Sequence, residues 1–81
     1  PTRVQARRHG AYLTVSWEKV KASDLAGYRV YLSRPGSALP LPYTRLGETN
    51  LEVRVEGPLE VRVTSFDVGN HESRPGSKVS L

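Results

Sequence analysis

Residues 59–73 read Leu59-Glu60-Val61-Arg62-Val63-Thr64-Ser65-Phe66-Asp67-Val68-Gly69-Asn70-His71-Glu72-Ser73 and carry the clearest structural signal in the chain. In their first half, aliphatic or small side chains alternate with charged, polar or aromatic ones. A period of two predicts a β-strand with one buried face and one solvated face. The alternation stops at Asp67, and Gly69-Asn70 supplies turn residues that tolerate a positive φ. The stretch therefore predicts a strand followed by a tight loop.

Further short alternating segments, separated by turn residues, occupy most of the remaining chain. None of them shows the 3.6-residue period of a helix over a useful length. We expect strands at residues 2–7, 12–18, 28–33, 43–46, 51–56, 59–66 and 78–81. Short strands spaced in this way favour an all-β fold, and their alternation implies two sheets that pack face to face.

Turn chemistry marks several of the boundaries between these strands. We expect turns at Arg7-Arg8-His9-Gly10 and at Arg34-Pro35-Gly36-Ser37. In the second of these, proline presets φ and glycine accepts the positive φ of a type II turn. The segment Leu39-Pro40-Leu41-Pro42 should be extended and lie at a sheet edge, because proline cannot donate to a ladder.

The single tryptophan is expected to be the centre of the core. Trp17 shares one face of its strand with Leu13 and Val15. Since the face is apolar, we expect Trp17 to be buried against Tyr28 or Val63.

Composition limits the classes of protein that the chain can represent. Its 81 residues make one domain. The chain has no Cys, which excludes disulfides and thiolate metal sites. It has no Met and starts at Pro1, so we expect a domain excised from a larger protein or a processed product. No apolar run approaches the ~18 residues of a membrane span.

The net charge of +4 comes from 12 basic and 8 acidic residues. Acids interleave with the bases along most strands, which favours a solvated surface of mixed charge over a binding surface for an anionic partner. Arg outnumbers Lys, and Asn and Gln are few, so we expect a thermophilic source.

Three segments carry a resemblance to fibronectin type III domains. Leu13-Thr14-Val15-Ser16-Trp17 resembles the second strand of that family, and Leu25-Ala26-Gly27-Tyr28-Arg29-Val30-Tyr31 resembles the third. Val61 to Ser73 resembles the sixth strand and the loop after it. The resemblance implies a seven-strand antiparallel immunoglobulin-like sandwich. Strands one, two and five would form one sheet, and strands three, four, six and seven the other.

The sequence departs from the family pattern at the corner before the sixth strand. Many members carry a tyrosine there whose hydroxyl bonds back to the backbone. Here the loop is only Glu56-Gly57-Pro58, and Leu59 stands at the tyrosine position. We therefore expect the corner hydrogen bond to be missing and the fold to be retained.

The residues that could support catalysis or metal binding are better explained as turn residues. His9 and His71 lie in separate turns, whereas zinc needs three or four ligands. Asp67, His71 and Ser73 could suggest a triad, but a single loop does not hold the geometry of attack. The acids alternate with apolar residues on strands, and no glycine-rich phosphate loop precedes a helix. We expect no enzymatic activity, no metal and no cofactor.

The outward side chains of two strands predict a candidate interaction surface. Arg29, Tyr31, Arg62 and Phe66 all point outward on strands that the resemblance places side by side. The alternative is a mixed outer face on which Glu60 opposes the arginines. Aromatic and basic side chains on one face would suit a protein or a glycan. We expect no nucleic-acid partner, because that would need a clustered basic face with several stacking platforms.

The loop at residues 68–74, with Gly69, Asn70 and His71 at its centre, is the second candidate, since loops on a rigid scaffold often carry recognition. The resemblance implies a non-catalytic spacer or interaction module of a larger, extracytoplasmic bacterial protein, whose partners are neighbouring domains. The other hypothesis is a recognition domain for a glycan or a protein. A contiguous exposed patch around Tyr31 and Phe66 would favour recognition.

Overall fold

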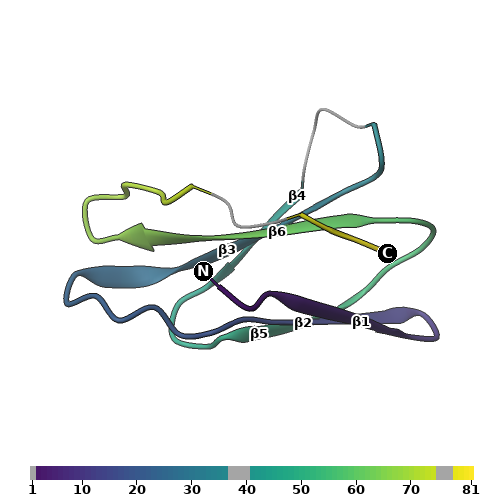
Figure 1. Ribbon diagram of the computed structural model, residues 1–81, viewed down its shortest axis with the longest axis horizontal. Helices are drawn as coiled ribbons and strands as arrows, with labels where there is room; N and C mark the ends of the chain where they lie inside the picture. Colours follow the sequence, from purple (N-terminus) through teal and green to yellow (C-terminus); the bar gives the residue numbers. More distant parts are fainter. Residues whose placement is uncertain (1, 37–40, 75–77) are drawn as a thin grey trace.

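The computed structural model describes residues 2–36, 41–74 and 78–81. Within them the strands are β1 (Gln5–His9), β2 (Tyr12–Ser16), β3 (Leu25–Ser33), β4 (Leu41–Arg45), β5 (Asn50–Arg54), β6 (Glu60–Asp67) and β7 (Val79–Ser80). They form a three-stranded sheet in the order β1-β2-β5 and a four-stranded sheet in the order β4-β3-β6-β7 (Figure 1). All pairings are antiparallel. This is the division between sheets that the family resemblance implies.

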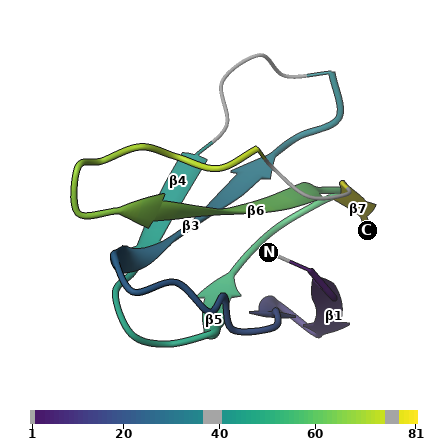
Figure 2. The ribbon, with the colours of Figure 1, turned by 60° about the vertical axis from the view of Figure 1, so that its left-hand side comes forward.

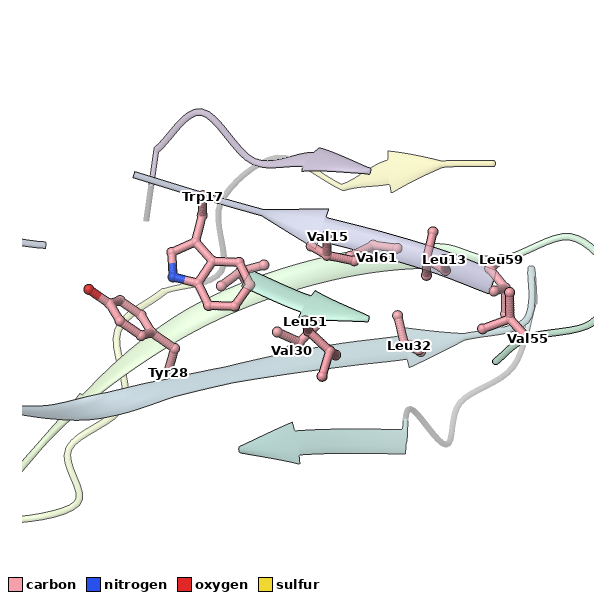
Figure 3. Packing of buried hydrophobic residues seen from close by; sticks show 11 residues of the cluster. Leu13, Val15, Trp17, Tyr28, Val30, Leu32, Leu51, Val55, Leu59 and Val61 are labelled. Carbon is pink, nitrogen blue, oxygen red and sulfur yellow. The ribbon is translucent and has the colours of Figure 1, made fainter. Parts of the chain in front are cut away.

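The core lies between the two sheets, where the inward residues of each strand meet (Figure 3). Period-two alternation dictates this packing, because it places every second side chain on the same face. The buried apolar residues are Leu13, Val15, Trp17, Tyr28, Val30, Leu32, Leu51, Val55, Leu59, Val61 and Val63.

The first strand differs from the prediction in both position and extent. Arg3 has a φ of 54°, which breaks the strand, so β1 begins at Gln5. At its other end, the predicted turn at residues 7–10 is wrong. β1 continues to His9, which pairs with Tyr12, and only Gly10 and Ala11 form the turn. Gly10 supplies the required positive φ of 58°, while the ladder to β2 keeps the three preceding residues extended.

The other boundaries shift by a few residues. β3 begins at Leu25 and not at Tyr28, with an irregularity in its pairing to β6 near Gly27. β4 lies at the edge of its sheet, as the prolines predict, and Pro42 is opposite Tyr31. Gly36 has the expected positive φ of 79°. Residues 37–40 lie outside the described part of the chain.

Trp17 is buried against Tyr28, which confirms the first of the two predicted neighbours. The ring centroids are 5.4 Å apart with an edge-to-face angle of 61°. This is a favourable geometry for two aromatic rings. The Tyr28 hydroxyl also accepts a hydrogen bond of 2.9 Å from the backbone amide of Val20. Tyr28 thus ties the link between β2 and β3 to the core.

We predict that Tyr28→Phe lowers the free energy of unfolding by about 0.5–1.5 kcal/mol, because the partly buried Val20 amide loses its acceptor. Chemical denaturation measures the loss, and hydrogen exchange should show faster exchange at Val20. Tyr43→Phe serves as the matched control, since it deletes the same hydroxyl from a half-buried position on β4. Equal losses in the two variants would contradict an anchoring role for Tyr28.

The corner before β6 contains an apolar side chain where many fibronectin type III domains have a tyrosine. Leu59 is buried in the core, and its amide and carbonyl both bond to Leu81. At the other end of the sandwich, the Thr2 carbonyl accepts a hydrogen bond from the amide of Glu18, next to Trp17. Because Leu59 and Trp17 lie at opposite ends of the core (Figure 3), the described chain enters and leaves at opposite ends.

Candidate interaction surface

The register between β3 and β6 brings the predicted surface residues to one face. Arg29 lies opposite Thr64, and Tyr31 lies opposite Arg62. Phe66 lies opposite a glycine, and its ring occupies the space above that residue. These positions alternate with the core residues of both strands, so their side chains lie on the outer face of the four-stranded sheet.

Arg29 is held in place by three contacts. Its guanidinium lies 4.2 Å from the centroid of the Phe66 ring, a cation–π arrangement. Its Nη1 donates to Glu72 Oε1 at 2.9 Å, and its Nη2 donates to Asn70 Oδ1 at 2.6 Å. The Arg29 side chain is only 23% exposed. Both of its terminal nitrogens therefore donate hydrogen bonds within the domain.

Glu72 is the residue around which this face is organised. Its Oε2 accepts hydrogen bonds from the Tyr31 hydroxyl at 2.5 Å and from Thr64 Oγ1 at 2.7 Å, while its Oε1 accepts the bond from Arg29. Charge-assisted bonds of this kind are stronger than neutral ones. We call Arg29, Tyr31, Thr64, Asn70 and Glu72 the Glu72 cluster.

Glu72 reaches these partners because the chain turns back along β6 (Figure 2). Phe66 and Glu72 form an antiparallel bridge. The Ser73 amide donates to the Ser65 carbonyl at 2.7 Å, and the Ser65 amide donates to Ser73 Oγ at 2.9 Å. The returning segment covers Thr64, which is only 2% exposed although it lies on the outer face.

The cluster shifts the pKa values of its two titratable members in opposite directions. The hydrogen bond from Tyr31, followed by that from Thr64 and the contact with Arg29, lowers the pKa of Glu72. The hydrogen bond to Glu72, with burial and the charge of the carboxylate, raises the pKa of Tyr31. The largest cause is the same for both shifts, because a neutral phenol that donates to a carboxylate favours the ionised acid and the protonated phenol.

We predict that these bonds make the stability of the domain depend on pH in acid and in alkali. Since the pKa of Glu72 is lowered on folding, its contribution is present above the unfolded pKa and is lost as pH falls through the folded pKa. Since the pKa of Tyr31 is raised, its contribution is present below the usual value of 10.0 and is lost as pH rises through the folded pKa. Glu72→Gln should remove the acid dependence, weaken the alkaline one, since burial still raises the pKa of Tyr31, and lower stability by about 1 kcal/mol at pH 7.

This prediction is tested by measuring the free energy of unfolding of the parent and of Glu72→Gln at acid, neutral and alkaline pH. Glu56→Gln is the matched control, because Glu56 is exposed and takes part in none of the described ion pairs. If the difference between the parent and Glu72→Gln stays constant at every pH, the cluster does not contribute as described.

The loop after β6 has the turn chemistry that the sequence predicts. Asp67 Oδ1 accepts hydrogen bonds of 2.9 Å from the amides of Gly69 and His71. Asn70 has a φ of 61°, in the left-handed region. His71 Nδ1 lies 3.2 Å from Asp67 Oδ2, and the His71 side chain is 85% exposed. The amide of His71 is the first cause that lowers the pKa of Asp67. Asp67 therefore organises the backbone of the loop.

Ser73 is oriented for structure and not for nucleophilic attack. Its Oγ accepts from the Ser65 amide and donates to the Arg74 carbonyl at 3.2 Å. A nucleophilic hydroxyl would instead donate to a general base. Within the described part of the chain, no three His, Cys, Asp or Glu side chains gather as a metal site would require. The same residues include no helix long and apolar enough to cross a membrane.

The carboxylate that pairs with an arginine of the predicted surface is not the one that the sequence suggested. Glu60 does not oppose the arginines, because it lies opposite Ser33 and pairs with Lys78 at 2.8 Å. The opposing acid is Glu72, which sequence reasoning did not include. Arg62 is exposed beside Tyr31 and takes part in none of the described ion pairs. Whether any of these residues binds a partner stays a prediction.

Tyr31 and Phe66 are both half-buried, and they are not among the large apolar residues that the described surface exposes. Those are Tyr12, Leu46 and Val68. Val68, at the tip of the loop, is 80% exposed. A pocket of about 310 Å³ lies beside this loop, between it and the link that precedes β3. Val20, Leu25, Phe66 and His71 contribute to its lining.

Comparisons with known proteins identify the fold. No protein-family model matches the sequence, and no curated protein matches it. Among solved structures, the FN1–FN3 domains of chicken CNTN1 superimpose with a TM-score of 0.92 at 16% identity, over 100% of this chain and 30% of that one. A structure described as a myokine gives 0.81 at 15% identity, over 100% and 92%. The spore cortex lytic enzyme SleM of Clostridium perfringens gives 0.72 at 22% identity, over 96% and 26%.

The chain therefore has a fibronectin type III-like fold, a β-sandwich of immunoglobulin-like class. It corresponds to less than a third of the CNTN1 structure and to about a quarter of the SleM chain. At these identities the likeness concerns the fold alone.

Proposed function

We propose that the domain is a non-catalytic spacer or interaction module of a larger, extracytoplasmic bacterial protein. Its direct partners would be the neighbouring domains of the same chain. The observation that carries this proposal is the Glu72 cluster, in which Arg29 and Tyr31 of the predicted surface already bond to Glu72 and Asn70 within the domain. A surface whose donors are already used has little to offer a polar ligand.

Two further observations support a spacer. The described chain enters beside Glu18 and leaves beside Leu59, at opposite ends of the core, which suits an in-line connection between domains. The described residues extend over 37 × 25 × 18 Å, which is the size of the spacer that one copy would provide. In the solved SleM enzyme, a region of similar fold is part of a longer bacterial chain.

A domain exchange in the full-length parent protein tests the proposal. A spacer requires length and shape, whereas a recognition domain requires particular side chains. We therefore expect that one domain of chicken CNTN1, with a TM-score of 0.92 but 16% identity, restores the activity of the parent protein. Deletion of the domain without replacement should lower that activity. Failure of the exchanged domain, with the native domain required, would contradict the spacer.

The alternative function is recognition of a glycan or a protein, through the outer face of β3 and β6 or the loop at residues 68–74. The pocket beside the loop favours this alternative, because exposed Val68 and His71 lie at or near it. Chemical-shift mapping of the isolated domain against candidate glycans and partner domains would test it. Shifts that centre on His71 and disappear in His71→Ala would support recognition by the loop.

A further inference from the structure

The outer face of the three-stranded sheet presents an exposed aromatic side chain between two basic ones. The register places Tyr12 of β2 between His9 of β1 and Arg54 of β5 in a single cross-strand row. Strands lie about 4.8 Å apart, so the row spans roughly 10 Å. In the next outward row, Thr14 lies between Arg7 and Glu52. We use the name basic row for the first row, His9, Tyr12 and Arg54, together with Arg7 from the neighbouring row.

The basic row is open to solvent. Tyr12 is 49% exposed, the largest exposure of any aromatic residue that the structure describes, and the three basic side chains are exposed. None of the ion pairs between described residues includes a member of the basic row. This contrasts with Arg29 on the opposite face, whose guanidinium bonds to Glu72 and Asn70.

The charge balance of the domain makes this face electropositive. Four of the eight acids, Glu18, Glu48, Glu60 and Glu72, are in ion pairs with Arg or Lys elsewhere, and Asp67 contacts His71. On the outer face of β1, β2 and β5, Glu52 is the carboxylate that accompanies Arg7 and Arg54. The outward positions of these three strands thus carry two guanidinium groups and one carboxylate, and Glu56 follows just beyond the end of β5.

We propose that the basic row is a docking surface for an acidic peptide segment in an extended conformation. Arginine binds carboxylates through two parallel hydrogen bonds, and Tyr12 adds apolar contact area and a hydroxyl. Tyrosine and arginine are also the residues that contribute most to interfaces when they lie at the centre of a contact. The central strand supplies only small outward side chains beyond Tyr12, at Thr14 and Ser16, so an extended chain can lie flat.

The observations favour a peptide over a strongly charged polymer. Single-stranded nucleic acid needs a series of aromatic platforms, and this face has one. A phosphate or sulfate polymer gains affinity from many cations, whereas here Glu52 lies within the same face. A peptide with two or three carboxylates about 7 Å apart, the spacing of alternate residues in a strand, matches the small number of cations.

Titration of the isotope-labelled domain with a synthetic peptide of alternating Glu and Thr residues tests the proposal, with the Gln and Thr peptide as its uncharged counterpart. We expect the acidic peptide to shift the amide signals of Arg7, Tyr12 and Arg54, and added salt to weaken binding. Tyr12→Ala and Arg54→Gln should each raise Kd about fivefold or more. Arg34→Gln, which changes an exposed arginine just after β3 on the other sheet, should leave Kd unchanged.

Several outcomes would overturn the docking surface. They are equal shifts with both peptides, shifts confined to the Glu72 cluster, tighter binding of a sulfated oligosaccharide or of single-stranded DNA, and the absence of shifts at millimolar peptide. The spectra of the variants show whether each remains folded, and Arg54→Gln changes an exposed side chain, so a loss of binding there is not a loss of fold. A spacer that failed the domain exchange could still bind the acidic peptide, so the two proposals are tested separately.

Discussion

Replacing Trp17 with Ala should lower the free energy of unfolding by about 3–5 kcal/mol, the usual range for removal of a buried tryptophan. Trp17 is 5% exposed and packs edge-to-face on Tyr28, so deletion leaves a cavity at one end of the core. A domain of this size has a total stability of only ~4–12 kcal/mol. The variant should therefore be largely unfolded at moderate temperature or melt some tens of degrees below the parent.

Thermal and chemical denaturation measure this loss of stability. Two further variants serve as controls. Trp17→Phe should lose much less, because it keeps an aromatic ring and removes an indole N–H that finds no acceptor among the described residues. Leu46→Ala deletes an apolar side chain that is 71% exposed and should change stability by less than about 0.5 kcal/mol. A Trp17→Ala protein that melts within a few degrees of the parent would contradict the two-sheet core.

The inward faces of the strands could be predicted from the sequence because they depend on local alternation alone. Val15 and Val63 are fully buried, as period two requires, and Trp17 contacts Tyr28 as predicted. The same alternation placed Arg29 and Phe66 on one outer face. The pairing of β3 with β6 then brings them into contact.

Features that depend on contacts between distant segments could not be predicted in the same way. Arg7 to His9 have no apolar alternation of their own, and their strand conformation comes from pairing with β2. Glu72 finds its partner Arg29 43 residues away in sequence. A signal for Glu72 did exist, because a three-residue loop at Val68-Gly69-Asn70 that reverses the chain places Glu72 opposite Phe66.

Gly27→Ala should lower the free energy of unfolding by about 1–3 kcal/mol, although alanine can adopt the backbone conformation at this position. The reason is that the neighbouring atoms leave no room for a methyl group. A Cβ at Gly27 would lie 2.7 Å from the carbonyl oxygen of Arg45 and 3.0 Å from the Phe66 ring. The first contact is with backbone, so β4 or β3 must move. The second displaces the ring on which Arg29 stacks.

Denaturation and the ring signals of Phe66 measure both consequences. The matched control is Gly47→Ala, since no heavy atom lies within 4 Å of a Cβ built at Gly47. That variant should be neutral or slightly more stable, because alanine restricts the unfolded chain. Adding Phe66→Ala to Gly27→Ala removes the contact with the ring but not the contact with the Arg45 carbonyl. If Gly27→Ala alone is as stable as the parent, the close approach of β3 to β4 at Arg45 is not a constraint on this position.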